Sequence, residues 1–106
     1  MGRLENKTAV ITGAGAGLGA QIARRFKQEG ARLVINDMNE DAAHNMADEV
    51  GGLGIAADVS DSAAVRSMFE RIQSELGTLD ILVNNAGFGF TPGDEETVRR
   101  VNEVPL

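Results

Sequence analysis

The run TGAGAGLG at residues 12–19 holds four glycines and two alanines in eight positions. A backbone without side chains can turn sharply and bring its N–H groups close to another molecule. Such a surface suits an anion, because the free N–H groups at the start of a helix carry the positive end of the helix dipole. The run could instead be a flexible linker or a tight turn that binds nothing.

The flanks of the glycine run argue against a linker. KTAVIT at residues 7–12 is β-branched and almost continuously apolar, as in a strand buried on both faces. After the run, Leu18, Ile22 and Phe26 recur every four residues and predict an amphipathic helix that ends at Gly30. A glycine-rich turn between such a strand and helix is typical of dinucleotide binding, although a ligand-free turn has the same pattern.

An acidic residue follows at the spacing that a dinucleotide site requires. Asp37 lies 24 residues after Gly13 and ends the second apolar run, where a carboxylate can bind the adenosine ribose hydroxyls. The same carboxylate would repel a 2′-phosphate, and neither Ala16 in the loop nor Met38 after the aspartate offers a basic side chain. The sequence therefore favours NAD(H) over NADP(H) as the cofactor.

The remaining composition excludes several other classes of chemistry. The chain has no cysteine, tyrosine or tryptophan, and its one histidine, His44, falls on the polar face of a predicted helix. Without cysteine there are no disulfides, thiolate nucleophiles or zinc–sulfur sites, and no metal site is predicted. A formal net charge of −6 argues against nucleic acid and anionic lipid as partners. No apolar run is long enough to span a membrane and no signal sequence is present, so we expect a cytoplasmic protein.

Short apolar runs alternate with helical patterns along the chain. Asn39 is the predicted cap of the second helix, and Ser60 or Asp61 that of the third. After residue 86 the pattern is less regular. The predicted strands are residues 7–12, 31–37, 53–59 and 79–84, and the predicted helices are residues 18–29, 39–50, 61–76 and, in the tail, 94–102.

This alternation predicts βαβ units and a parallel sheet. With right-handed crossovers the expected fold is an α/β, Rossmann-like, doubly wound sheet of four strands in the order 3-2-1-4, with helices on both faces. We expect a single dinucleotide-binding half-domain over residues 1–106, regular over residues 5–87 and irregular over residues 88–106.

Three motifs in this order resemble those of the short-chain dehydrogenases/reductases. Thr12-Gly13 with Gly17 and Gly19 looks like the family's TGxxxGxG signature. Asp58-Val59 resembles its adenine-contacting pair after the third strand, and NNAG at residues 84–87 resembles its motif after the fourth. The resemblance covers the chain from Arg3 to Gly87.

The resemblance implies a cofactor site at the carboxyl ends of the strands. In the family the NNAG motif both braces the sheet and lines the ribose site. Asn84 could therefore either contact the cofactor or have a purely structural role, with hydrogen bonds between strand ends. The implied cofactor-binding residues are Gly13, Ala16, Gly17, Leu18, Gly19, Asp37, Met38, Asp58, Val59, Asn85, Ala86 and Gly87.

The family's proton relay is only partly represented in this chain. The relay consists of a tyrosine, a lysine four residues later, a serine and an asparagine, and this chain has no tyrosine. Asn102 is the candidate for the relay asparagine, and a solvated asparagine at a helix end is the alternative.

Two functions of different classes follow. The first is the NAD(H)-binding part of an oxidoreductase that interconverts an alcohol and a carbonyl, with the tyrosine and lysine half absent from this chain. The second is a non-catalytic dinucleotide-binding or self-assembling module. In either case we expect a homo-oligomer, formed through the edge strand at residues 79–84 or the helix at residues 63–76.

Overall fold

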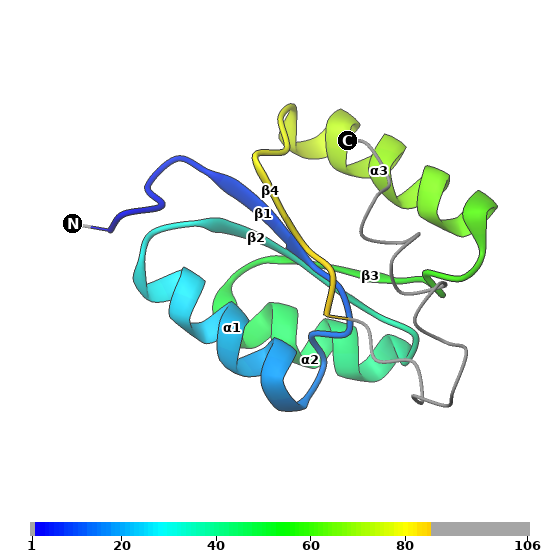
Figure 1. The fold of residues 1–106 in the computed structure, drawn as a ribbon, viewed down its shortest axis with the longest axis horizontal. Coiled ribbons are helices and arrows are strands. Elements are labelled where there is room, and N and C mark those ends of the chain that lie inside the picture. The colour runs from blue at the N-terminus through cyan, green and yellow to red at the C-terminus, as the bar shows by residue number, and fades with distance from the viewer. Residues whose placement is uncertain (1, 86–106) are drawn as a thin grey trace, which may run out of the picture.

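The computed structural model describes residues 2–85 and shows a parallel sheet covered by helices on both faces (Figure 1). The strands are β1 (Thr8–Ile11), β2 (Arg32–Asp37), β3 (Leu53–Ala56) and β4 (Ile81–Val83). The helices are α1 (Gly17–Gln28), α2 (Glu40–Val50) and α3 (Ser62–Leu76). The sheet order is β3-β2-β1-β4, which confirms the predicted fold class and strand order.

The register brings the carboxyl ends of the strands to one edge of the sheet. Val10 of β1 lies opposite Val34 of β2 on one side and opposite Leu82 of β4 on the other. All three strand pairs are parallel. The loops that leave β1, β2 and β4 at their carboxyl ends are therefore neighbours.

Two apolar clusters lie on opposite faces of the sheet. On one face, Ile11 and Ile35 pack with buried residues of α1 and α2, among them Ala23 and Met46. On the other face, the buried residues are Val10, Val34 and Ile55 of the strands and Met68 and Ile72 of α3. Successive strand residues serve opposite faces, and this is why the strands are apolar without interruption.

The two predicted helix caps are present. The Asn39 side chain accepts a hydrogen bond from the Ala42 N–H at the start of α2. At the start of α3, the Asp61 carboxylate accepts from the Ala63 and Ala64 N–H groups, so Asp61 rather than Ser60 is the cap.

All four strands are shorter than predicted, and the difference is largest for β3 and β4, at three residues each. β3 ends at Ala56 instead of residue 59, because the Asp58 carboxylate accepts hydrogen bonds from the Ser60 N–H at 2.9 Å and the Ser60 hydroxyl at 2.7 Å and so forms a turn. β4 begins at Ile81 instead of residue 79 and ends at Val83. The predicted tail at residues 88–106, with its helix at residues 94–102, lies outside the described residues.

None of the helices within residues 2–85 is long and apolar enough to cross a membrane.

Candidate cofactor site

The loop between β1 and α1 is a tight turn with two residues in the left-handed region. Gly13 has a φ of 62° and Gly17 a φ of 61°, values that residues other than glycine adopt only with backbone strain. The Ala14 N–H donates to the Asn36 carbonyl at 2.9 Å, which attaches the loop to β2. The loop therefore starts at the carboxyl end of β1 and crosses towards the end of β2.

Helix α1 begins without a side-chain cap. Ala16 occupies the N-cap position in an extended conformation, makes no side-chain hydrogen bond to the helix, and is followed by a first turn with no acidic residue. By contrast, α2 and α3 begin with the capping side chains of Asn39 and Asp61. The first N–H groups of α1, at Gly17, Leu18 and Gly19, are thus left for a group outside the helix, and the helix dipole favours an anion there.

The Asp37 carboxylate lies beside this loop. One of its oxygens accepts a hydrogen bond from the Gly15 N–H at 3.0 Å, and the other accepts from the Asn39 N–H at 3.0 Å. Asp37 is only partly buried. A carboxylate at the end of β2, next to the glycine loop, is the arrangement that the spacing between Gly13 and Asp37 predicted.

On the other side of β1, the end of β4 is fastened to the same loop. The Asn85 side-chain amide donates to the Gly13 carbonyl at 3.2 Å, and the Asn85 N–H donates to the Thr12 hydroxyl at 3.0 Å. The Thr12 hydroxyl in turn donates to the Val83 carbonyl at 3.3 Å. A Cβ atom on Gly19 would lie 2.5 Å from the Gly13 carbonyl oxygen and collide with the Asn85 amide. Asn85 thus braces the loop.

The third predicted segment lies after β3. The hydroxyl and N–H of Ser60 hold the pKa of the Asp58 carboxyl below its ordinary value, so this side chain is an anion at neutral pH. Val59 lines a groove of about 840 Å³ that runs between α3 and β4, and Thr12 and Asn84 line it as well.

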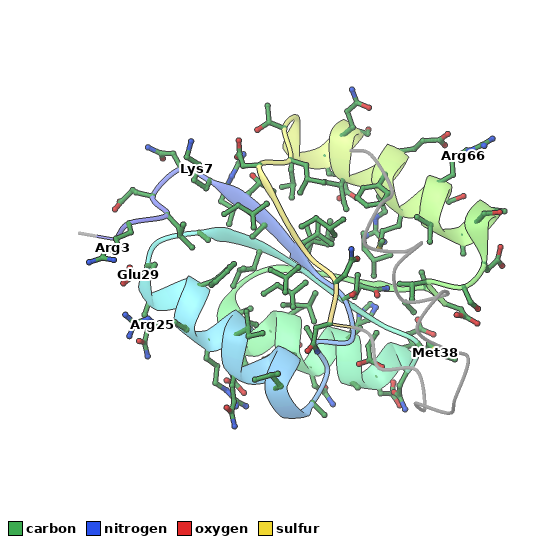
Figure 2. All side chains as sticks on the ribbon, in the orientation of Figure 1. Arg3, Lys7, Arg25, Glu29, Met38 and Arg66 are labelled. Atoms are coloured by element: carbon green, nitrogen blue, oxygen red, sulfur yellow. The ribbon has the colours of Figure 1, made fainter. Side chains whose placement is uncertain are left out.

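Two exposed apolar side chains flank the loop and the end of β2. Leu18, in the first turn of α1, is 65 % exposed, and Met38, directly after Asp37, is 71 % exposed. Figure 2 shows Met38 at the opposite end of the molecule from Arg3 and Lys7. Met38 directly follows β2 and Leu18 is the second residue of α1, so both lie at the edge where the carboxyl ends of the strands meet, and neither is part of the core.

The structure thus brings most of the predicted residues to one edge of the sheet: Gly13, Ala16, Gly17, Leu18, Gly19, Asp37, Met38 and Asn85. The predicted residues Ala86, Gly87 and Asn102 lie outside the described residues. His44 is exposed on α2, as expected. In the part of the chain that the structure describes, no group of acidic and histidine side chains could hold a metal ion.

Sequence reasoning missed the role of Asn36 beside this site. Asn36 is 1 % exposed, and its side-chain amide donates to the carbonyls of Ile55 and Ala57 at 3.1 Å each. It fastens the end of β3 to β2 just before the turn at Asp58. The available signal was an amide residue at the end of the otherwise apolar run LVI in β2.

Known proteins share both this sequence and this fold. The family model of the short chain dehydrogenases matches residues 7–105. The chain is 48 % identical over its full length to an uncharacterized oxidoreductase, YxbG, of Bacillus subtilis, and covers 38 % of that protein. Over 82 % of its length it is 45 % identical to the 7alpha-hydroxysteroid dehydrogenase of Escherichia coli, of which it covers 36 %.

A solved structure extends the comparison to three dimensions. The 3-ketoacyl-(acyl-carrier-protein) reductase of Brucella melitensis, complexed with NADH, matches 94 % of this chain at 40 % identity with a TM-score of 0.81. The match covers 45 % of the reductase. The chain thus spans less than half the length of these relatives. Since the family model matches nearly the whole chain, the chain belongs to the short chain dehydrogenase family.

Proposed function

We propose that residues 12–19 and the strand ends around them bind NAD(H), as part of an oxidoreductase that interconverts an alcohol and a carbonyl. The observation that carries this proposal is the uncapped start of α1 beside the Asp37 carboxylate. One end of this site presents N–H donors to an anion, and the other presents a carboxylate to hydroxyl groups. An adenosine diphosphate moiety has both kinds of partner, and the related Brucella reductase is described as complexed with NADH.

Each part of the proposed site has a separate task. The N–H groups of Gly17, Leu18 and Gly19 would bind the pyrophosphate, and Asp37 would bind the adenosine ribose. The exposed side chain of Met38 would lie near the adenine, together with Asp58 and Val59. Asn85 would keep the loop in register with β4, and Ala86 and Gly87 would line the nicotinamide ribose. The bound nicotinamide supplies or accepts the hydride.

The position of Asp37 favours NAD(H) over NADP(H). Its carboxylate already accepts two backbone N–H groups and faces the loop from the end of β2. A 2′-phosphate there would meet a negative charge, and neither neighbouring candidate, Ala16 nor Met38, is basic.

Calorimetric titration of the intact chain with NAD and with NADP tests this proposal. We expect NAD to bind at least tenfold more tightly than NADP, and we expect Asp37→Ser to reduce that ratio. Asp41→Ser removes the same charge from the first turn of α2 and should leave the ratio unchanged. Equal binding of both nucleotides by the wild-type chain would contradict the cofactor preference, and no binding of either would contradict the site.

The alternative function is a non-catalytic dinucleotide-binding or self-assembling module. The sequence contains no tyrosine, the residue that the family's relay uses, so the sequence is compatible with this alternative as well. Measuring NADH formation with a panel of alcohols separates the two functions. Turnover by this chain would rule out the module.

We also propose that the chain forms homo-oligomers. Within residues 2–85, β4 pairs only with β1, so its other edge is available to a further strand. Residues 79–84 and residues 63–76 are the two candidate surfaces. Sedimentation at increasing protein concentration tests this, and a single monomeric species at high concentration would contradict it.

A further inference from the structure

We propose that Asp37 is a positioning residue for the glycine loop, which it holds in an anion-binding shape before any cofactor arrives. The inference deepens the proposed function and rests on it in one respect, namely that the loop binds the cofactor phosphates. In that function Asp37 has one task, to bind the ribose. The contacts of its carboxylate assign it a second.

Two consecutive loop residues are attached to two consecutive residues of β2. The Ala14 N–H donates to the Asn36 backbone carbonyl at 2.9 Å, and the Gly15 N–H donates to the Asp37 carboxylate at 3.0 Å. The first contact is of the backbone type found throughout the sheet, whereas the second needs this side chain. A hydrogen bond to a carboxylate is stronger than one between neutral groups. Asp37 is therefore the last attachment of the loop before the chain turns into α1.

The space around Gly15 supports this role. A Cβ atom at this position would lie 2.8 Å from the Asp37 carboxylate oxygen and 2.7 Å from the Ala42 Cβ. Gly15 is not among the residues with positive φ, so its backbone conformation does not require glycine. What requires glycine is the close approach of the Asp37 carboxylate and helix α2.

The second carboxylate oxygen fixes the direction of the side chain. It accepts the Asn39 N–H at 3.0 Å, so the carboxylate is held between the loop and the start of α2. A carboxylate has about four acceptor positions, and two are used here. The other two can still accept ribose hydroxyls, so binding the ribose does not require the loop contact to break.

The two tasks of Asp37 have opposite effects on an anion that lacks a ribose. The negative charge of the carboxylate repels such an anion, so a side chain that serves only the ribose weakens its binding. A side chain that also holds the loop strengthens it by keeping the N–H groups in place. Replacing Asp37 therefore distinguishes the two cases. Pyrophosphate affinity should rise if Asp37 serves only the ribose, and it should fall if Asp37 also holds the loop.

The first experiment measures amide hydrogen exchange in the ligand-free, full-length chain by NMR. In Asp37→Ala we expect the Gly15 amide to exchange on the order of tenfold faster than in the wild type, since it loses a charge-assisted hydrogen bond. Slow exchange at Ile11 and Ile35 in the same spectra shows that the sheet remains folded. An unchanged exchange rate at Gly15 in the folded variant would overturn the proposal.

Two control variants separate the loop contact from other effects of the substitution. Asn39→Ala removes the cap of α2 but keeps Asp37, and Asp41→Ala removes a charge from the first turn of α2. Both should leave Gly15 exchange within about twofold of the wild type. If Asn39→Ala speeds Gly15 exchange as much as Asp37→Ala does, the effect belongs to α2 and the proposal is wrong.

The second experiment titrates inorganic pyrophosphate into the wild-type chain and Asp37→Ala, with the amides of Gly17 and Leu18 as reporters. We expect binding to the variant to be several-fold weaker despite the lost negative charge. Tighter binding to the variant, or no binding to the wild type, would overturn the proposal. The exchange experiment contains no nucleotide, so a failure to bind NAD would contradict the proposed function alone.

Discussion

Gly13 and Gly17 have positive φ angles, whereas Gly15 and Gly19 lie where a Cβ atom would collide with a neighbour. The first two are required by backbone conformation and the other two by space. At Gly15 the neighbours are Asp37 and α2, and at Gly19 they are the Gly13 carbonyl and Asn85. At the residue scale, two glycines of the motif are thus required because other parts of the chain approach the loop closely.

The Thr12 hydroxyl connects that loop to the end of β4. Removing this hydroxyl should lower the free energy of unfolding. Thr12→Val keeps the shape of the buried side chain but leaves the Asn85 N–H without the hydroxyl that accepts it at 3.0 Å. We expect the free energy of unfolding to fall by about 1 to 3 kcal/mol in urea denaturation. Thr78→Val, at an exposed position, is the matched control and should change stability by less than about 0.5 kcal/mol. Equal effects of the two substitutions would contradict this role.

Asp58 offers a prediction about pH. The Ser60 hydroxyl is the main cause of its lowered pKa, and the Ser60 N–H contributes as well. Ser60→Ala should therefore raise the Asp58 pKa towards its ordinary value of 3.8, as measured by ¹³C NMR of the carboxyl carbon. Ser62→Ala, at the first residue of α3, should leave this pKa unchanged.

The sign of the linked effect on stability follows from the direction of the shift. Because the pKa is lower in the folded chain, the turn at Asp58 and Ser60 stabilises the fold above pH 3.8. That stabilisation is lost as the pH falls through the folded-state value. An Asp58 pKa in Ser60→Ala equal to that of the wild type would contradict the assigned cause.

At the scale of the elements, the uncapped start of α1 lowers the stability of the helix but leaves its N–H groups available for binding. Its N-cap position is extended, with φ of −160° and ψ of 172°, so a capping side chain at Ala16 would fit the backbone. The chain has alanine there, although the other two helices have capping side chains. This difference is expected if the N–H groups of α1 are reserved for a ligand.

The substitution Ala16→Asp tests that difference. The new carboxylate should cap α1 and raise the free energy of unfolding by about 0.5 to 1 kcal/mol. The same carboxylate would occupy the proposed pyrophosphate position, so we expect NAD affinity to fall at least tenfold in calorimetry. Ala16→Ser is the neutral control, with a similar gain in stability and a smaller loss of affinity. Unchanged NAD binding by Ala16→Asp would contradict a phosphate site at this helix.

Sequence patterns predicted the elements better than their ends. Alternating apolar runs and helical periods identified the strands, the helices and the order 3-2-1-4, because each pattern reflects burial of a whole face. The early end of β3 was missed, since it depends on a turn between Asp58 and Ser60 that competes with strand pairing. The roles of Asn36 and Gly15 were missed for another reason: their partners are distant in sequence, and only the folded chain brings them together.

At the scale of the whole molecule, β2 joins two separate apolar layers. Its neighbouring residues Val34 and Ile35 are both fully buried but belong to opposite faces, one packed towards α3 and the other towards α1 and α2. Neither face can lose its helices without exposing the apolar side of the shared sheet. The loops that we propose bind the cofactor lie at the edge of this sheet, so their geometry depends on both layers being intact.

We therefore expect residues 2–85 to unfold in one cooperative step. Ile35→Val removes one methylene from the face towards α1 and α2, and Ile72→Val does the same on the face towards α3. Each should lower the free energy of unfolding by about 0.5 to 1.5 kcal/mol. Because the chain has no tryptophan or tyrosine, hydrogen exchange along a urea series is the suitable measurement. Each substitution should shift the midpoint equally for amides of α2 and of α3. If Ile72→Val destabilised α3 while the midpoint of α2 stayed constant, the two layers would be independent units, and the loops would depend on only one of them.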